Sequence, residues 1–207
     1  MAKTFTVPSD PEASKLLAQL RDTSLPPAVV RRVTRDLTAS LTKHVLSLPA
    51  PPSSPTANDS EQVAVIVVLR SGLAMVDPVM DFFPDDADTV IYHLGMFREK
   101  VSLQPVEYYN KLPPKNPRIK HAYVLDPLVA TGGTATAVIG ILKDWGVEKI
   151  TLFSLLGSRT GLEAVANVWP EGTEVFAGGV DDGLDDKGYV KPGVGDIGDR
   201  LFGTALS

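Results

Sequence analysis

The stretch Val124-Leu-Asp-Pro-Leu-Val-Ala-Thr-Gly-Gly-Thr134 passes from apolar residues through one acid into a cluster of glycines and threonines. The residues around it predict a buried strand at 121–126 and a helix at 134–146. Where such a strand ends and such a helix begins, backbone N–H groups and the positive end of the helix dipole face the same point. The stretch therefore predicts a loop that binds phosphate, in which glycine lets the backbone approach the oxygen atoms closely.

Taken alone, this loop leaves a second interpretation open, because Gly132 and Gly133 would equally suit a tight turn that binds nothing. It is not a Walker loop, since no Gly-Lys-Ser/Thr follows, and it lacks the spaced triple glycine of dinucleotide folds. Asp126, at the tip of the strand, is suited to accept hydrogen bonds from sugar hydroxyls. On the first interpretation the ligand is a phosphate attached to a sugar.

Strands and helices alternate on both sides of the loop. Continuous β-branched apolar runs and helical periodicity predict further strands at 63–69, 89–95, 149–156 and 174–179, a helix at 161–169, and a short or kinked helix at 73–83. This alternation predicts an α/β fold, a Rossmann-like parallel sheet flanked by helices on both faces. In such sheets ligands bind at the carboxyl ends of the strands.

The rest of the chain is expected to surround this sheet as part of one domain, residues 1–207. Apolar residues recur every three or four positions from Val29 to Leu48, Ser24 could cap the resulting helix, and the Pro- and Ser-rich stretch 49–62 predicts an exposed loop. Two segments rich in Gly, Pro and charge, 95–118 and 181–204, are expected to be irregular and to meet above the sheet as a hood. The predicted division is a helical N-terminal region with its loop (1–62), a core (63–180), and a C-terminal hood and tail (181–207).

Composition excludes several classes of function. With 43% hydrophobic and 22% charged residues and no apolar run of membrane-spanning length, we expect a soluble protein with no membrane partner. The sequence has no cysteine and no apolar block near its first residue, which favours a cytoplasmic location. A net charge of −5 disfavours a nucleic-acid surface but leaves room for a small anionic ligand held by a few cations.

Two arginines follow predicted strands and could reach the same edge of the sheet. Arg70 comes directly after the first strand, and Arg98 lies shortly after the second. Two guanidinium groups in one crevice suit a doubly charged leaving group such as pyrophosphate. For either arginine alone, a solvated surface position is the alternative interpretation.

The C-terminal stretch "GYVKPGVGDIGDRLFGT" (188–204) follows the last predicted strand and can reach the same edge. Its backbone N–H and C=O groups could bind a planar ligand, with Asp196 near a sugar or metal-bound phosphates; a glycine-rich tail without a ligand is the alternative. The three histidines lack metal-ligand spacing, and the aspartates at 181, 182, 185 and 186 lack the spacing of a calcium loop.

Four ordered motifs resemble those of uracil phosphoribosyltransferases, which have the type I phosphoribosyltransferase fold. They are "LRSGLAMVD" (69–77), "GMFREKVSLQPVEYYNKLP" (95–113), "VLDPLVATGGTATAVIGILK" (124–143) and the C-terminal stretch 188–204. The resemblance extends from about Val63 to Thr204, whereas the first sixty residues match poorly.

The resemblance implies transfer of a phosphoribosyl group from 5-phosphoribosyl 1-diphosphate (PRPP) to N1 of uracil, which gives UMP and pyrophosphate with Mg²⁺ as cofactor. It also implies a homodimer or higher homo-oligomer. Arg70 and Arg98 would hold the pyrophosphate, and Asp126 the ribose hydroxyls. The 5′-phosphate loop would be Pro127, Leu128, Val129, Ala130, Thr131, Gly132, Gly133 and Thr134. Uracil would be surrounded by Val190, Gly195, Asp196 and Ile197, largely through main-chain groups, with Asp196 also facing PRPP. No protein ligand to the metal is assigned.

The chain departs from the family pattern at several positions: Ser71, Ala74, Pro78, Lys100 and Ile197. Ile197 replaces an alanine beside the uracil, so its longer side chain would narrow the site if it pointed there. This departure prompts a second hypothesis, a phosphoribosyltransferase for another base. A third hypothesis, from a different class, is a regulator that binds PRPP or a nucleotide without turnover.

Overall fold

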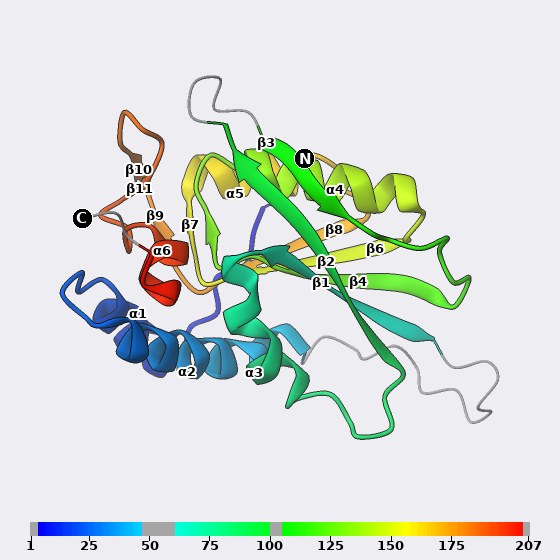
Figure 1. Ribbon diagram of the computed structural model, residues 1–207, viewed down its shortest axis with the longest axis horizontal. Coiled ribbons are helices and arrows are strands. Elements are labelled where there is room, and N and C mark those ends of the chain that lie inside the picture. The colour runs from blue at the N-terminus through cyan, green and yellow to red at the C-terminus, as the bar shows by residue number, and fades with distance from the viewer. Residues whose placement is uncertain (1–3, 47–60, 100–104, 205–207) are drawn as a thin grey trace.

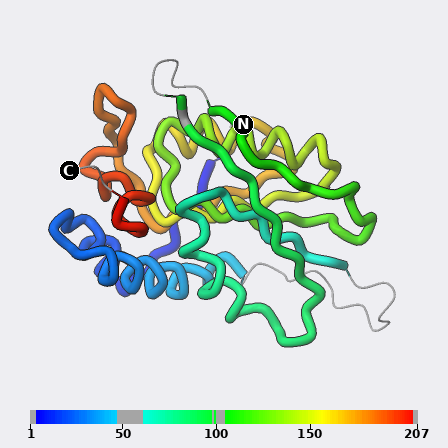
Figure 2. Tube along the Cα trace, in the orientation of Figure 1, coloured from blue at the N-terminus to red at the C-terminus, as the bar shows by residue number. Residues whose placement is uncertain are grey.

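The computed structural model describes residues 4–46, 61–99 and 105–204 and contains a central sheet with helices on both faces (Figures 1 and 2). In spatial order the sheet consists of β3 (Pro105–Asn110), β2 (Thr89–Arg98), β1 (Gln62–Leu69), β4 (Ile119–Leu125), β6 (Lys149–Ser154) and β8 (Thr173–Ala177). The strands from β2 to β8 are parallel, and β3 pairs antiparallel with β2. The predicted α/β fold with a parallel sheet is confirmed.

Two apolar clusters cover the two faces of the sheet. Because successive strand residues point to opposite faces, Val65 of β1 joins one cluster and Ile66 joins the other. The first cluster also contains side chains from α1, α2, α3 and α6, and the second contains side chains from α4 and α5 (Figure 1). The helices are α1 (Pro11–Leu20), α2 (Pro27–Leu46), α3 (Val76–Met80), α4 (Gly133–Trp145), α5 (Arg159–Ala166) and α6 (Ile197–Phe202). Burial on both faces explains the continuous apolar run of β1.

The order of the strands reverses between β1 and β4. The chain leaves β1 through a 3₁₀ helix, η1 (Ser71–Met75), into α3 on one face, and it leaves β4 toward α4 on the other. Adjacent parallel strands whose connections depart to opposite faces leave a crevice between their carboxyl ends, and this is where α/β proteins bind ligands. The fold therefore places the quoted loop, which follows β4, at the edge of that crevice.

Shorter strands extend the structure beyond the carboxyl edge of the sheet. A three-stranded parallel sheet contains β5 (Leu128–Val129), β7 (Leu156–Ser158) and β9 (Val180–Asp181), and a hairpin contains β10 (Gly183–Leu184) and β11 (Val190–Lys191). The strand predicted at 149–156 is thus two strands, β6 and β7. We call the described residues 181–204, which include α6, the hood. They lie beside this edge, at the left of Figure 1.

Three sequence-based expectations differ from the structure. Helix α1 has no predicted counterpart, although Asp10 caps it and Pro11 opens it. The segment 95–118 is not irregular, because β2 continues to Arg98 and β3 follows it. The segment 181–204 is not irregular either, because it contains β10, β11 and α6. Since β3 is mostly exposed, it lacks the alternation of buried apolar residues by which strands are recognised. Most of the loop predicted at 49–62 lies outside the described residues.

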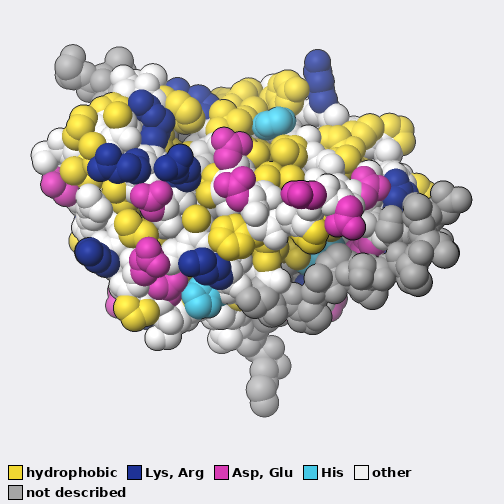
Figure 3. All heavy atoms as spheres, turned by 90° about the horizontal axis from the view of Figure 1, so that it is seen from below, with side chains coloured by type: hydrophobic (Ala, Val, Ile, Leu, Met, Phe, Trp, Pro, Cys, Tyr) yellow, Lys and Arg dark blue, Asp and Glu magenta, His cyan; other side chains and the backbone are white. Residues whose placement is uncertain are grey.

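The surface on the side of α1, α2 and α3 carries charges of both signs. In the view from that side, Lys and Arg side chains lie among Asp and Glu side chains (Figure 3). Within residues 4–46, 61–99 and 105–204, no helix is long and apolar enough to span a membrane.

Leu37 tests the packing of α2 on the sheet. Its side chain is completely buried in the first apolar cluster, so Leu37→Ala should leave a cavity and lower the free energy of unfolding by about 2–5 kcal/mol. Arg35, exposed on the same helix, is the matched control, and Arg35→Ala should change the same quantity by about 0.5 kcal/mol or less. Urea unfolding with an unchanged m-value measures both. Equal losses in the two variants would contradict the predicted packing.

Candidate active site

A pocket opens at the carboxyl ends of β1, β2 and β4, at the reversal of strand order. Its volume is about 180 Å³. The lining residues come from the ends of these strands and from the loop before α4: Val68, Leu69, Ser71, Met96, Asp126, Leu128, Val129, Ala130, Thr131, Gly132, Gly133, Thr134 and Ala135. The predicted phosphate loop is therefore part of the wall of the pocket.

Gly132 is required by the geometry of this loop. Gly132 precedes α4 with φ of +84°, a left-handed conformation, and a Cβ on it would lie 2.7 Å from the carbonyl oxygen of Gly161. No side chain caps α4. The first N–H groups of a helix have no intrahelical acceptor, so those of α4 are available to an anion in the pocket, together with the hydroxyl groups of Thr131 and Thr134.

The first half of the loop is fixed by the scaffold behind it. The carbonyl of Pro127 accepts hydrogen bonds from the N–H groups of Leu155 and Leu156, at 3.1 and 3.2 Å. The hydroxyl of Ser158 donates to the carbonyl of Ala130 and also accepts the N–H of Gly161. These contacts fix residues 127–130, so the amides of 131–134 that follow are held in place. Among them, the Gly133 N–H makes one long hydrogen bond, to Thr131 Oγ1 at 3.5 Å.

Asp126 is a buried carboxyl group in the pocket wall. Its residue is 6% exposed, and this burial raises its pKa to about 7, an effect that a hydrogen bond from the N–H of Leu128 partly offsets. Near neutral pH the group is close to its titration midpoint. A ligand whose hydroxyl groups donate to the carboxylate would stabilise the ionised form, which is what ribose hydroxyls would do.

Arg70 lies next to the pocket but is not among its lining residues. Its Nη2 donates to Asp199 Oδ1 at 3.2 Å and to Thr204 Oγ1 at 3.5 Å, and its guanidinium carbon lies 5.5 Å from the centre of the Phe202 ring. The peptide bond between Leu69 and Arg70 is cis. In this structure Arg70 therefore connects the end of β1 to α6, and its contact with pyrophosphate stays a prediction.

Arg98 is the last residue of β2, and its main chain pairs with Pro105 at the start of β3. Its side chain lies outside what the structure describes. The predicted contact with pyrophosphate is therefore untested.

The predicted uracil-binding residues lie together in the hood and do not line the pocket. Gly195 (φ +71°) and Asp196 are exposed, and Asp196 Oδ1 accepts the N–H of Asp199 at the start of α6. Val190 and Ile197 are 4% and 5% exposed, and both belong to the apolar cluster under α2. The side chain of Ile197 thus packs in the core, so its size affects packing rather than the exposed main chain beside it.

Several pocket residues are absent from the predicted site. Ser71 and Met96 belong to this group, as do Val68, Leu69 and Ala135. Ser71 carried a usable signal because it lies two residues after the end of the predicted strand 63–69. Met96 did not, because the second strand was predicted to end at residue 95, whereas β2 continues to Arg98.

The number of carboxylates in the pocket indicates how it could bind a metal ion. Asp126 is the single carboxylate among the pocket-lining residues, and within the described ranges no three His, Cys, Asp or Glu side chains gather as metal ligands. Mg²⁺ in phosphate sites is commonly held by one or two carboxylates together with substrate phosphates and water. The donor set therefore fits an ion that arrives with a phosphorylated substrate.

The sequence profile of uracil phosphoribosyltransferases matches residues 7–204. This chain belongs to the uracil phosphoribosyltransferase family. The match begins before α1, so the family likeness includes the N-terminal helices, and the expectation that the first sixty residues match the family poorly is wrong.

Individual relatives agree with this assignment. The urg2 protein of Schizosaccharomyces pombe, provisionally named a uracil phosphoribosyltransferase, is 44% identical over 200 residues, which cover 97% of this chain and 90% of the relative. The uracil phosphoribosyltransferase of Thermus thermophilus is 33% identical over 210 residues, covering 97% and 99%.

Solved structures show the same fold. The AQ2163 protein of Aquifex aeolicus aligns with a TM-score of 0.84 at 25% identity, over 99% of this chain and 100% of that one. A hypoxanthine phosphoribosyltransferase of Trypanosoma cruzi with its product IMP aligns with a TM-score of 0.51 at 12% identity, over 74% and 75%. The second likeness concerns the fold alone.

Proposed function

We propose that this protein transfers the phosphoribosyl group of PRPP to N1 of uracil, giving UMP and pyrophosphate in pyrimidine salvage. The observation that carries this proposal is the pocket at the reversal of strand order, where the uncapped start of α4 and the buried Asp126 share one wall. These features suit a 5′-phosphate and ribose hydroxyls, the two parts of PRPP that do not react. The family match supplies uracil as the base.

In this mechanism the chain binds and orients, and no side chain acts as a nucleophile. The amides of residues 131–134 hold the 5′-phosphate, and Asp126 accepts hydrogen bonds from the ribose hydroxyls. As the bond from ribose C1 to pyrophosphate lengthens, positive charge grows on the sugar and negative charge on the leaving group. The carboxylate of Asp126 favours the first, and Arg70 and Arg98 are proposed to favour the second.

Arg70 would have to change partners to take this role. Its side chain is about half exposed and is held by Asp199 and Thr204, contacts of the kind that contribute about 1 kcal/mol or less. A diphosphate with several negative charges can replace such a partner. The proposed role is thus compatible with the position of Arg70 beside the pocket.

Mg²⁺ is proposed to enter with the diphosphate of PRPP. Asp126 is the pocket carboxylate that could contact it or its water ligands, and the ion would supply positive charge to the leaving group. A homodimer or higher homo-oligomer and a cytoplasmic location are likewise proposals, and sedimentation of the purified protein tests the first.

One alternative loses the observation that prompted it. A different base was prompted by Ile197, whose side chain packs in the core. A regulator that binds PRPP without turnover would use the same pocket and Asp126, so an assay for turnover separates it from the enzyme.

The reaction is tested by incubating purified protein with PRPP, Mg²⁺ and one base at a time, and by following UMP and pyrophosphate. We expect turnover with uracil and little with hypoxanthine, guanine or adenine. Turnover of a purine without turnover of uracil would overturn the proposal, and binding of PRPP without any turnover would favour a regulator.

Ile197→Ala restores the residue usual in the family. Because the Ile197 side chain is 5% exposed within the core cluster, we expect the variant to lose about 2 kcal/mol or more of unfolding free energy. Its preference for uracil over other bases should not change. The base panel and urea unfolding measure the two effects, and a relaxed preference in the variant would place this side chain in the base site after all.

A further inference from the structure

The corner between α1 and α2, residues 21–26, is joined to the hood by two arginines that are far apart in sequence. Arg21 reaches from the corner into the hood, and Arg200 reaches from α6 back to the corner. In Figure 1 the corner lies beside α6. None of the four sequence motifs includes this corner, so neither the motifs nor the proposed reaction assigns it a role.

Arg21 forms a bidentate ion pair that also holds the backbone of Gly193. Its Nη1 and Nη2 lie 2.8 and 2.7 Å from the two carboxylate oxygens of Asp181, and Nη1 also donates to the Gly193 carbonyl at 2.9 Å. The N–H of Gly193 donates in turn to Asp181 at 2.8 Å. Asp181 is 7% exposed, so the pair is shielded from solvent on the carboxylate side. Both polar groups of the Gly193 backbone are therefore used by this pair.

Arg200 connects the same two regions in the opposite direction, from α6 in the hood to the α1–α2 corner. Its Nη1 donates to the carbonyl groups of Val194 and Leu20, and its Nη2 donates to the carbonyl of Asp22. The last turn of α1 contains no basic residue, although cations at a helix C-terminus satisfy carbonyl groups and interact favourably with the dipole. Arg200 supplies this cation from the hood. At the same time it binds the carbonyl of Val194, the residue that follows Gly193.

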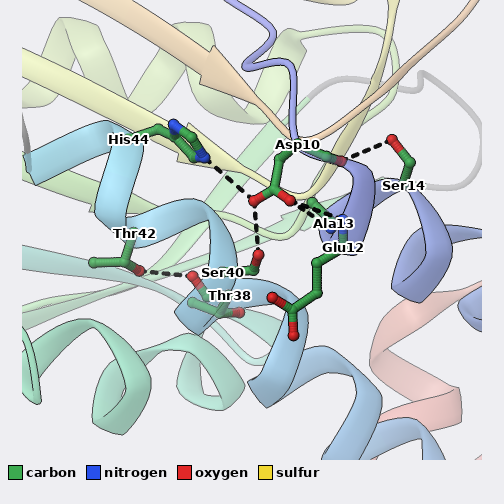
Figure 4. A network of polar contacts seen from close by, with 8 residues as sticks. All are labelled: Asp10, Glu12, Ala13, Ser14, Thr38, Ser40, Thr42 and His44. Atoms are coloured by element: carbon green, nitrogen blue, oxygen red, sulfur yellow. Dashed lines mark hydrogen bonds and ion pairs between the residues drawn. The ribbon is translucent and has the colours of Figure 1, made fainter.

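Helix α1 is also attached to α2 at its N-terminal end, opposite the corner. Asp10 caps α1 by accepting the N–H groups of Glu12 and Ala13, and its other oxygen accepts the hydroxyl of Ser40 at 2.7 Å and lies 3.2 Å from His44 Nε2 (Figure 4). The hydrogen bond from Ser40 is the largest cause that lowers the pKa of Asp10 to about 2. Helix α1 is thereby fixed to α2. The α1–α2 corner, which binds the hood, is therefore held in a defined position.

The held residues directly precede the main chain that is proposed to recognise uracil. Residues 193 and 194 are bound by Asp181 and the two arginines, whereas Gly195 is exposed and a Cβ on it would meet only Arg200 Cδ, at 3.5 Å. Main-chain recognition depends on the positions of a few N–H and C=O groups, so an unsupported loop would lose binding free energy to the ordering of its backbone.

We propose that Arg21, Asp181 and Arg200 are positioning residues for base recognition, and that the α1–α2 corner acts as the support of the loop 192–196. The proposal rests on the proposed reaction for its substrate and names residues that touch neither PRPP nor uracil. It predicts that loss of these residues raises the KM for uracil more than the KM for PRPP. The loop 127–134 has further support from Ser158 and β7, but Asp181 pairs with Ser158 and Asp196 is predicted to face PRPP, so the KM for PRPP should rise by a smaller factor.

The test uses Asp181→Asn, which removes the ion pair with little change of volume, and Arg21→Gln, which removes the ion pair and shortens the side chain. Each should raise the KM for uracil about 10-fold to 100-fold and raise the KM for PRPP by a clearly smaller factor. Arg21→Lys, which keeps the charge but not the bidentate contact, should lie between wild type and Arg21→Gln. The matched control is Arg159→Gln, because Arg159 pairs with the neighbouring Asp182 at 2.6 Å in an exposed position; it should leave both KM values unchanged.

Hydrogen exchange of the full-length proteins gives a second readout that needs no turnover. Amides at 193–197 should exchange faster in Arg21→Gln and Asp181→Asn than in wild type or Arg159→Gln, whereas those of α4 should not change. If wild type does not use uracil, the proposed reaction fails, and the exchange data still decide whether the corner supports the loop. Unchanged exchange at 193–197, or equal rises in both KM values, overturns the positioning role.

Discussion

Asp126→Asn is expected to lower kcat/KM for PRPP about 10²-fold, the largest loss of any single change in the pocket. The amide oxygen can still accept one ribose hydroxyl, but the amide nitrogen cannot accept the second, and hydrogen bonds to a charged group contribute about 1.5–3 kcal/mol each. The missing negative charge also removes stabilisation of the sugar as it becomes positive. Steady-state kinetics with PRPP varied at saturating uracil measure this loss.

The same variant should be more stable than wild type at alkaline pH. The pKa of Asp126 is about 7 in the folded protein and has its ordinary value of 3.8 when the chain is unfolded. Between these values the unfolded chain releases its proton first, so the folded wild type loses stability as pH rises from about 4 to 7, and the loss is complete above pH 7. The rise from 3.8 to about 7 corresponds to at most about 4 kcal/mol. Asparagine does not titrate, so the free energy of unfolding of the variant does not fall in this way as pH rises.

The measurement is the difference in unfolding free energy between Asp126→Asn and wild type at pH 5 and pH 8 without substrate. The difference should grow in favour of the variant at pH 8. Asp144→Asn, at an exposed carboxylate of α4, is the control and should show no such growth. A difference that is the same at both pH values would show that Asp126 is not desolvated in the free protein.

Gly161→Ala is expected to raise the KM for PRPP about 10-fold or more although Gly161 does not line the pocket. A Cβ on Gly161 would overlap the carbonyl oxygen of Ala130, and it would also lie 3.0 Å from Ser158 Oγ. Backbone cannot move aside as a flexible side chain can, so the loop 126–134 must shift. Overpacking of this kind lowers the free energy of unfolding by about 1–3 kcal/mol.

Gly140→Ala provides a matched control for this substitution. Gly140 lies within α4, and a Cβ there would meet nothing within 4 Å. Replacing a helical glycine with alanine should stabilise the protein by about 0.5–1 kcal/mol and leave the kinetics unchanged. Isothermal titration with PRPP and thermal unfolding of both variants separate the two cases. A Gly161→Ala protein that binds PRPP as wild type does would mean that the position of the loop is not critical.

Much of the fold and part of the site could be predicted from local sequence patterns. The apolar run 63–69 was recognisable as a strand because β1 is buried on both faces. Gly132 marked a tight loop before α4 because only glycine accepts a positive φ at such a close approach. Helix α1 and strand β3 were not recognised. The first is short with few buried residues, and the second is an exposed edge strand, so neither shows the periodicity that burial imposes.

The sequence by itself determined the parallel α/β sheet, the glycine-containing loop after its central strand, and Asp126 at the tip of that strand, because these depend on residues that are neighbours along the chain. Only the tertiary structure decided that Asp126 is desolvated, that Ile197 turns into the core, that Arg70 binds Asp199, and that Arg21 and Arg200 hold the hood. Each of these depends on which distant segments pack together. Burial and long-range hydrogen bonds arise from that packing, and local residue patterns do not contain them.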